Sequence, residues 1–371
     1  MPRLNNTPQA PATRVEFVAS PVLDMVNAMF FTSLVPQMDG VDGWPERLRG
    51  EMAPDLLADL DFLYTYPAAD PGIMGVFGDN LFAHPECWGS VESLVRYLRA
   101  MPPGDTGSEA DPGIQGLIYQ ATFRYPEEAE TAPYRTLPPG EAIERRMRDL
   151  GDRDAGAIMS IYGRPEELRE RMGRLIERFF DEHYREEMPQ RLPSLERSVA
   201  AHRDDTGADP AQLMTRLTGR PTSCLEGGGF CEAGGPYRRL IFTPSLDMGP
   251  YNSCAIVDGI HGLYYACEPQ FRGAPAEAQE TERTARIFKA LGDEQRLRIL
   301  RLLREREMYA QEIVERTRLH QSVVSRHLAF MKAVGLVRVR RQNNMKFFSL
   351  NPAMREELQP TLDLFPAAPA S

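Results

Sequence analysis

The sequence predicts a mainly helical protein with small β elements, of the α+β class, with a large N-terminal region and a smaller C-terminal one. Three observations support this prediction. The chain has 371 residues, too many for one ordinary hydrophobic core. Apolar positions recur every three or four residues over long N-terminal stretches, as they do on the buried faces of helices. Short β-branched and aromatic runs follow after residue 238, and the net charge changes sign after residue 281.

The N-terminal region is predicted to consist mostly of helices. Residues 1–13 are polar and rich in proline, and we expect a disordered tail there. Ser20 and Pro21, a capping residue and a proline at the first helical position, predict a helix over 22–34. Periodicity predicts further helices at 45–64, 90–100, 139–150 and 165–187. Segments rich in Pro, Gly and Asp predict loops at 67–80, 101–114 and 126–140.

Three short runs near the end of this region predict a small β-meander or hairpin. They are β-branched or aromatic and bounded by Gly and Pro, and they cover residues 239–244, 252–258 and 262–267. Residues 272–281 are expected to be a linker. The predicted organisation is therefore a sensor or regulatory domain at 14–271 and a second domain at 282–365.

Charge is divided unevenly between the two predicted domains. The whole chain has a formal net charge of −10. Residues 282–359 contain 17 Lys and Arg against 9 Asp and Glu, whereas residues 1–281 contain 26 against 43. This asymmetry points to contact between the basic part and nucleic acid or a membrane surface. No uncharged apolar stretch reaches 18 residues, and the N-terminus lacks the pattern of an export signal, so we expect a cytoplasmic protein without membrane contact.

The basic region predicts helices and a hairpin in a fixed order. Helices are expected at 282–291, 294–304, 310–317 and 321–334, strands at 336–341 and 346–350, and a last helix at 352–364. In the second helix Leu297, Leu300 and Leu303 are expected to face inward, and Arg296 outward. The order helix–helix–turn–helix–hairpin–helix is that of a winged helix-turn-helix, which binds DNA or, in the alternative left open, protein.

The helix over 321–334 has one face suited to burial and one suited to reading DNA. The buried face has a spacing of four and three, at Val324, Leu328 and Met331. The opposite face carries hydrogen-bonding side chains of the kind that read base edges in the major groove: Gln321, Ser322, Ser325 and Arg326. For His327, packing, phosphate contact and base contact all stay open. Salt-dependent phosphate contacts are expected from the hairpin, through Arg338, Arg340, Arg341 and Lys346.

Three stretches of the basic region resemble, in order and register, ArsR-type bacterial repressors. ALGDEQRLRIL (290–300) resembles their opening signature, QSVVSRHL (321–328) their recognition helix, and AVGLV (333–337) their helix-to-wing junction. The resemblance covers roughly residues 282–360. It implies a homodimer formed through residues 282–291 and 352–364. This dimer is expected to bind a palindromic operator in double-stranded DNA. The resemblance also implies repression more often than activation. EMYAQ (307–311) lacks the Cys-x-Cys of metal-sensing members, so no metal or other cofactor is expected.

The N-terminal region resembles an effector region found in front of such modules in actinobacterial regulators. The resemblance rests on VEF (15–17), on Ser20 and Pro21, and on LIFTPS (240–245). We expect this region to sense an unknown signal, such as a small-molecule effector, or to reinforce the dimer.

Candidate catalytic and metal-binding residues form no recognisable pattern. Gaps of 7, 23 and 13 separate Cys224, Cys231, Cys254 and Cys267, too wide for a zinc knuckle, so scattered buried thiols are expected. The glycines at 227–229 lack the Lys and Ser/Thr of a phosphate loop. No catalytic residue is assigned, and the protein is expected not to be an enzyme. The alternative is an enzyme or a partner-binding body fused to a DNA-binding module.

Overall fold

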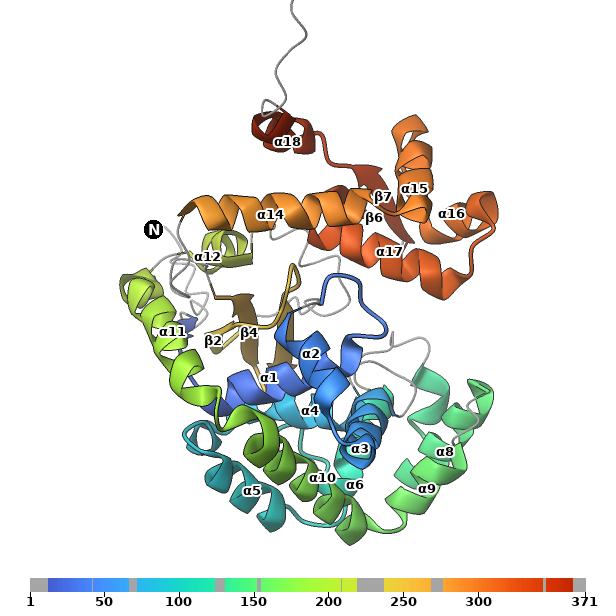
Figure 1. The fold of residues 1–371 in the computed structure, drawn as a ribbon. Helices are drawn as coiled ribbons and strands as arrows, with labels where there is room; N and C mark the ends of the chain where they lie inside the picture. The colour runs from blue at the N-terminus through green and yellow to red at the C-terminus, as the bar shows by residue number, and fades with distance from the viewer. Residues whose placement is uncertain are drawn as a thin grey trace, which may run out of the picture.

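The computed structural model describes residues 13–41, 43–66, 72–123, 131–151, 155–207, 209–218, 237–267, 276–342 and 345–362. The predicted tail up to residue 12, the tip of the predicted hairpin at 343–344 and residues 272–275 of the predicted linker lie outside them. The predicted α+β class is confirmed: helices dominate, and the strands form two small sheets (Figure 1). Within the described part of the chain, no helix is both long enough and apolar enough to cross a membrane.

A four-stranded mixed sheet lies at the centre of the N-terminal region. In spatial order its strands are β1 (Arg14–Phe17), β2 (Arg239–Ser245), β4 (Ile260–Ala266) and β3 (Ser253–Val257). β2 runs parallel to both β1 and β4, while β3 and β4 form an antiparallel hairpin. The hairpin of β3 and β4 agrees with the prediction. A meander is not formed, because β4 rather than β3 lies next to β2. Arg239 on β2 donates to Glu16 on β1 at 2.7 Å, across 223 residues of sequence.

Helices cover both faces of this sheet. They are α1 (Pro21–Leu34), α2 (Trp44–Glu51), α3 (Pro54–Thr65), α4 (Gly72–Asn80), α5 (Val91–Ala100), α6 (Gly113–Phe123), α8 (Pro139–Asp149), α9 (Ala155–Tyr162), α10 (Pro165–Phe179), α11 (Met188–Ala201) and α12 (Pro210–Thr218). Ser20 caps α1 as predicted, because its Oγ accepts the N–H of Leu23 at 3.0 Å. The helix expected over 45–64 is instead two helices, since Pro54 opens α3.

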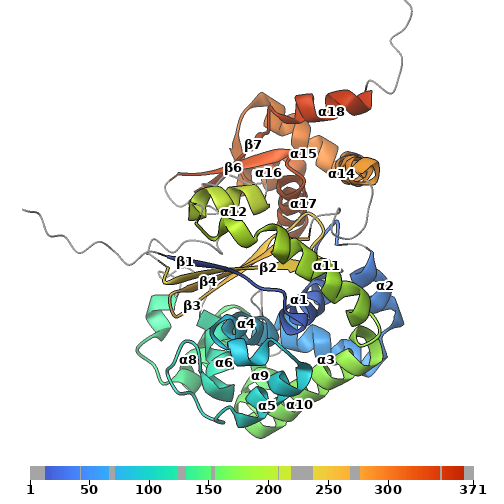
Figure 2. The ribbon, with the colours of Figure 1, turned by 90° about the vertical axis from the view of Figure 1, so that its left-hand side faces the viewer.

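Side chains of the sheet alternate between two hydrophobic clusters. Ile241 and Tyr264 belong to the main core, whereas Leu240 and Phe242 pack with Leu213 of α12. This alternation follows from the two-residue period of a strand. Figures 1 and 2 show the resulting layers, with α1 to α10 on one side of the sheet and α12 with the C-terminal elements on the other.

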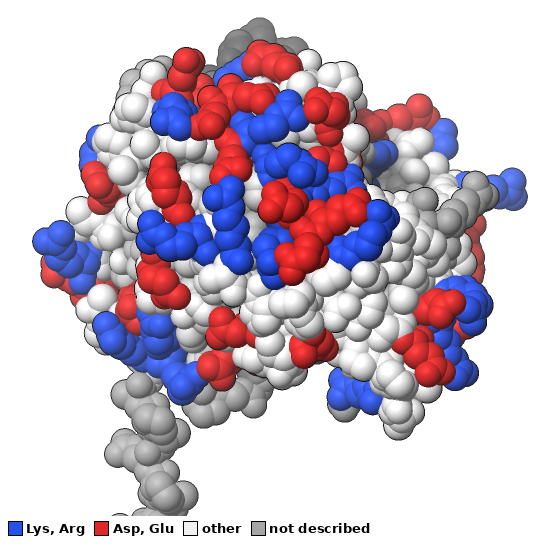
Figure 3. All heavy atoms as spheres, turned by 90° about the horizontal axis from the view of Figure 1, so that it is seen from below, with Lys and Arg blue, Asp and Glu red and all other residues white. Residues whose placement is uncertain are grey.

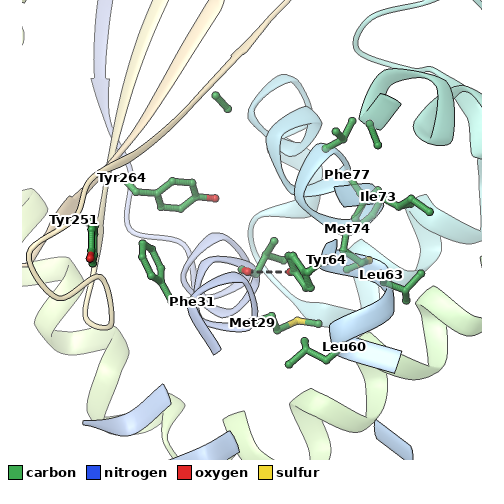
Figure 4. Packing of buried hydrophobic residues seen from close by; sticks show 14 of the residues in the cluster. Met29, Phe31, Leu60, Leu63, Tyr64, Ile73, Met74, Phe77, Tyr251 and Tyr264 are labelled. Carbon is green, nitrogen blue, oxygen red and sulfur yellow. Dashed lines mark hydrogen bonds between the residues drawn. The ribbon is translucent and has the colours of Figure 1, made fainter. Parts of the chain in front are cut away.

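The main core lies where α1, α3, α4 and the sheet meet (Figure 4). Tyr64 on α3 is buried there, and its hydroxyl donates to the carbonyl of Val26 on α1 at 3.1 Å. The loop predicted over 67–80 is wrong from residue 72, because α4 occupies the rest. Its glycines hid the helical pattern, yet they have a packing role: a Cβ on Gly78 would lie 2.7 Å from the Val26 side chain. The small residue therefore lets α4 approach α1 closely.

A buried ion cluster, formed by Asp24, Arg191 and Asp247, joins α1, α11 and the loop between β2 and β3. The Nε of Arg191 donates to Asp24 at 2.8 Å, and the same guanidinium pairs with Asp247. The hydroxyl of Tyr184 donates to Asp24 at 2.7 Å. All three charged side chains are nearly inaccessible, and one oxygen of Asp24 has no hydrogen-bond partner among the described residues. The cluster therefore places two carboxylates around a single cation inside the core.

The C-terminal residues form the winged module, residues 276–362. Its elements are α14 (Ala276–Leu291), α15 (Glu294–Glu305), β5 (Met308–Tyr309), α16 (Ala310–Thr317), α17 (Gln321–Ala333), β6 (Val337–Gln342), β7 (Met345–Leu350) and α18 (Met354–Leu362). The strands form a sheet in the order β5-β7-β6. α14 begins six residues earlier than predicted, inside the expected linker. The Ala and Glu residues that suggested a linker have high helix propensity and are compatible with this helix.

The buried face of α15 differs from the predicted one. Arg296 is buried, whereas Leu297 is 40% exposed. The Nε of Arg296 donates to the carbonyl of Ala290 at 2.7 Å, and its Nη2 donates to that of Lys289 at 2.8 Å. These are carbonyls of the last turn of α14, which have no partner within that helix. Arg296 therefore faces inward because it satisfies them.

Candidate nucleic-acid interface

The turn between α16 and α17 sets the direction in which α17 begins. Arg318, after α16, has a left-handed backbone with φ of 59°, and its N–H donates to the carbonyl of Val314 at 2.8 Å. His320 caps α17, because its Nδ1 accepts the N–H of Ser322 at 3.3 Å. Arg318 and His320 thus position the start of α17, although the predicted site residues include neither.

One predicted face of α17 is accessible to solvent. Gln321, Ser322 and Ser325 are all exposed. The opposite face is buried in the module as predicted, through Val324, Leu328 and Met331. Three of the predicted base-reading residues therefore share one accessible surface on the first two turns of the helix.

The other two predicted residues of α17 face the N-terminal region instead. The Arg326 side chain is 37% exposed, and its Nε lies 3.6 Å from Oδ1 of Asp39, too far for a hydrogen bond. His327 is buried, with Nε2 2.9 Å from the Oε1 of Gln295 and Nδ1 3.3 Å from Oδ2 of Asp39. Of the roles left open for His327, packing is the one that this arrangement supports.

Asp39, in the loop between α1 and α2, is the residue that the sequence analysis missed. Besides Arg326 and His327, it faces Arg296, whose Nη1 donates to Oδ2 of Asp39 at 2.7 Å. Hydrogen bonding with His327, followed by the charges of Arg296 and Arg326, holds the pKa of Asp39 below its usual range, although partial burial opposes the shift. We call this group the Asp39 contact: one carboxylate among three basic side chains.

The wing carries the predicted phosphate-contacting residues. Arg338, Arg340 and Lys346 are exposed on β6 and β7. Arg340 is already paired, since its Nη2 lies 2.5 Å from Oε1 of Glu307, and this pairing lowers the pKa of Glu307. Arg341 stands opposite Lys346 in the strand register, but its side chain lies outside the described residues. The wing therefore offers a basic surface on which Arg340 is partly neutralised.

The face of the molecule turned away from the winged module has a different charge pattern. Figure 3 shows basic and acidic side chains interspersed over it. Arg178 on α10 illustrates the reason: it pairs at 2.7 Å with both Asp55 and Glu182. This face presents no continuous basic surface suited to a phosphate backbone.

No three His, Cys, Asp or Glu side chains gather as a metal site within the part of the chain that the structure describes. Cys87, Cys254 and Cys267 are buried cysteines outside any disulfide. Burial is the main reason that the pKa of Cys87 rises to about 12, which keeps it protonated and unreactive. Cys224, Cys231 and the glycines at 227–229 lie outside the described residues.

Comparison with known proteins identifies the family that the winged module resembles. A family model described as "Bacterial regulatory protein, arsR family" matches residues 293–339. The transcriptional activator HlyU of Vibrio cholerae is 36% identical over 87 residues, which make up 22% of this chain and 81% of HlyU. The uncharacterized HTH-type transcriptional regulator MJ1325 of Methanocaldococcus jannaschii is 37% identical over 71 residues, 19% of this chain and 80% of that protein.

Solved structures give matches of similar extent. HlyU from Vibrio cholerae has 28% identity and a TM-score of 0.20, covering 24% of this chain and 96% of that one. NolR from Sinorhizobium fredii has 28% identity and a TM-score of 0.22, covering 26% of this chain and 96% of that one. From the family model and the curated relatives, the chain belongs, through its winged module, to the arsR family of bacterial regulatory proteins.

Proposed function

We propose that this protein is a sequence-specific DNA-binding transcriptional regulator. The observation that carries the proposal is the accessible polar face of α17, with Gln321, Ser322 and Ser325 at the start of a helix that follows a tight turn. In this class of module the N-terminal residues of the second helix contact base edges in the major groove. The relatives named above are transcriptional regulators, and none is named as an enzyme.

The proposed division of labour follows the chemistry of the side chains. Gln321, Ser322 and Ser325 would bond base edges, and Arg326 would grip a guanine through two hydrogen bonds, worth about 1–3 kcal/mol of discrimination. Phosphate contacts would come from the wing: Arg338, Arg340, Arg341 and Lys346. These contacts supply affinity without sequence information and weaken as salt rises.

We further propose a homodimer on a palindromic operator. The dimer would form through α14 and α18, which flank the winged core. Phe288 on α14 is 45% exposed, so its aromatic side chain is available to pack against a second copy of the chain. Two reading helices would then enter half-sites about 34–36 Å apart, one turn of the duplex. Repression is the expected sign of regulation, although the relative HlyU is named an activator.

The N-terminal region is proposed to sense a signal or to reinforce the dimer. A cavity of about 30 Å³ lies between α1, α4 and the sheet, lined by residues that include Asn27, Asp79 and Tyr264. That volume has room for one or two water molecules. A small-molecule effector would therefore have to open this cavity, and it could act only by binding one arrangement of the protein better than another.

Selection from a random pool of duplex DNA tests the function. We expect the full chain to enrich a palindromic sequence, and a gel shift on that sequence to weaken with salt. Arg326→Ala and Gln321→Ala should relax the sequence preference. Arg178→Ala, the same charge change on the remote face, should not. A wild-type protein that enriches nothing, or variants of α17 that keep the full preference, would overturn the proposal.

A reporter placed behind the selected sequence tests the sign of regulation. Expression that falls when the protein is present supports repression, and expression that rises shows activation. Native mass spectrometry on the full chain tests the dimer, and Phe288→Asp should give a monomer.

A further inference from the structure

We propose that the loop between α1 and α2 is an intramolecular competitor of DNA, in which Asp39 occupies the flank of α17 that a phosphate backbone would otherwise line. The inference rests on the proposed function and adds its regulation. The structure would then show a closed form, in which the acidic N-terminal region masks part of its own DNA-binding surface.

The position of the loop conflicts with a duplex. An α-helix with its side chains is about 10–12 Å across. The major groove is about 12 Å wide, so a helix inserted in it has a phosphate backbone close to each flank. One flank of α17 carries Arg326, His327 and Phe330, and the loop covers all three. The same space cannot hold both the loop and a backbone of DNA.

Gly40 shows how closely the loop approaches. A Cβ on Gly40 would lie 2.3 Å from the ring of Phe330, and the backbone there has a φ of +83°. Phe330 is buried between this loop and α15, since the guanidinium of Arg296 also lies 5.1 Å from the centre of its ring. Only glycine fits this position without displacing the loop or the ring.

The charge of the loop matches that of the competing ligand. Asp39 offers carboxylate oxygens to Arg296 and Arg326, as a phosphate or a guanine edge would offer acceptors. The region that carries Asp39 has an excess of 17 acidic over basic residues across positions 1–281. Because DNA is also strongly anionic, the region would repel a duplex lying along α17 for as long as the loop remains docked.

The Asp39 contact is incomplete at Arg326, so DNA can replace the loop there. The Nε of Arg326 is buried beside Asp39 without a hydrogen bond. A buried donor without a hydrogen bond is stabilised when an acceptor becomes available, and DNA bases and phosphates carry suitable acceptors. DNA therefore gains a contact at Arg326 that the loop does not supply.

The loop is also held from the N-terminal side, which gives the region a way to control it. The hydroxyl of Tyr251 donates to the carbonyl of Asp39 at 2.6 Å. Gly249 packs against Gly40 so closely that a Cβ on it would lie 2.5 Å from the Gly40 carbonyl oxygen. Both residues belong to the loop between β2 and β3, which also carries Asp247 of the buried ion cluster. A change in that loop would reach Asp39 directly.

Two variants of the full chain test the competition by different means. Asp39→Asn removes the charge and keeps the shape, and Gly40→Ala adds a methyl group that must push the loop from Phe330 without any change in charge. Asp61→Asn is the matched control, because Asp61 pairs with Arg49 in the N-terminal region. The measurement is the affinity for the selected duplex, by fluorescence anisotropy at one fixed salt concentration.

We expect both loop variants to bind at least about fivefold more tightly than wild type, the lower end of usual coupling between sites. The control should bind within about twofold of wild type, because the Asp61–Arg49 pair joins α3 to α2 within the N-terminal region. If wild type binds DNA and both loop variants bind no better, the competition is overturned while the proposed function stands. If no variant and no wild type binds any duplex, the proposed function itself fails.

Hydrogen exchange of the wild-type protein provides a readout that no mutation disturbs. Saturating duplex should raise exchange in peptides covering residues 36–41, since the loop leaves α17, while peptides of α17 become more protected. A loop that keeps its protection when DNA is bound would overturn the proposal, whatever the variants do.

Discussion

Two groups of charged side chains join distant parts of this chain, and their composition is opposite. The buried ion cluster sets two carboxylates around one arginine, nearly inaccessible and within the N-terminal region. The Asp39 contact sets one carboxylate among three basic side chains, partly exposed and between the two regions. Removing one partner of the buried ion cluster leaves an unpaired charge in the core. In the Asp39 contact, water or DNA can replace a lost partner. The comparison suggests that the first holds the fold together and that the second can be exchanged.

The largest expected effect is on the buried ion cluster. Arg191→Met should lower the free energy of unfolding by about 3–5 kcal/mol, because Asp24 and Asp247 would remain buried without a cation. Chemical denaturation measures the change. Arg178→Met is the control: it breaks ion pairs at the surface and should cost much less. Equal costs for the two substitutions would remove the distinction between a buried and an exposed cluster.

The next effect concerns Arg296, which belongs to the Asp39 contact and also caps α14. Arg296→Met should destabilise the protein by about 1–3 kcal/mol, since the carbonyls of Lys289 and Ala290 lose their partner. Arg298→Met is matched on the same helix, because Arg298 is exposed and its ion pair among the described residues is with Glu294. Thermal unfolding measures both variants. If Arg298→Met costs as much as Arg296→Met, burial of Arg296 is not the cause.

A smaller effect is expected from pH. The pKa of Asp39 lies below its usual 3.8 in the folded protein, so the folded state binds this proton less readily than the unfolded state does. The stabilisation is therefore fully present above about pH 3.8 and is lost as the pH falls through the lowered value. The difference in unfolding free energy between wild type and Asp39→Asn should shrink as the pH falls from 5 towards 3. A difference that stays the same at pH 3 would mean that the Asp39 charge is not its source.

The smallest effect separates two arginines of the wing. Arg338→Ala should reduce the slope of log affinity against log salt by about 0.9, the value for one phosphate contact. Arg340→Ala should reduce it less, because Glu307 already neutralises much of the Arg340 charge. Titrations of the selected duplex at several salt concentrations measure both slopes. Equal slopes would show that the Arg340–Glu307 pair opens when DNA binds.

The winged module could be predicted from the sequence almost element by element because its signals are local. α16 covers the predicted residues, and α15 starts where Asp293 was expected to cap it, with the Asp293 carboxylate accepting the N–H of Arg296 at 2.9 Å. The exposed positions of Gln321, Ser322 and Ser325 follow from helical periodicity in the same way.

The N-terminal region and the Asp39 contact could not be predicted because their determinants are distant. The pairing of Arg296 with Asp39 spans 257 residues, and a single carboxylate in a loop carries no periodic pattern. Arg296 was predicted to face outward like the other arginines of α15. Its burial is explained by the carbonyls at the end of α14, which the periodicity of α15 does not reveal. α4 was hidden by glycines whose value lies in close packing against another helix.

The pairing of β1 with β2 has a consequence for the order of folding. During synthesis from the N-terminus, β1 waits unpaired until a strand more than 200 residues later has been made. Parallel pairing over such a separation is slow, because a long loop must close first. β4, which extends the sheet, is completed only shortly before the winged module begins. The winged module is therefore synthesised after every strand of this sheet, and the α1–α2 loop already exists when α17 is made.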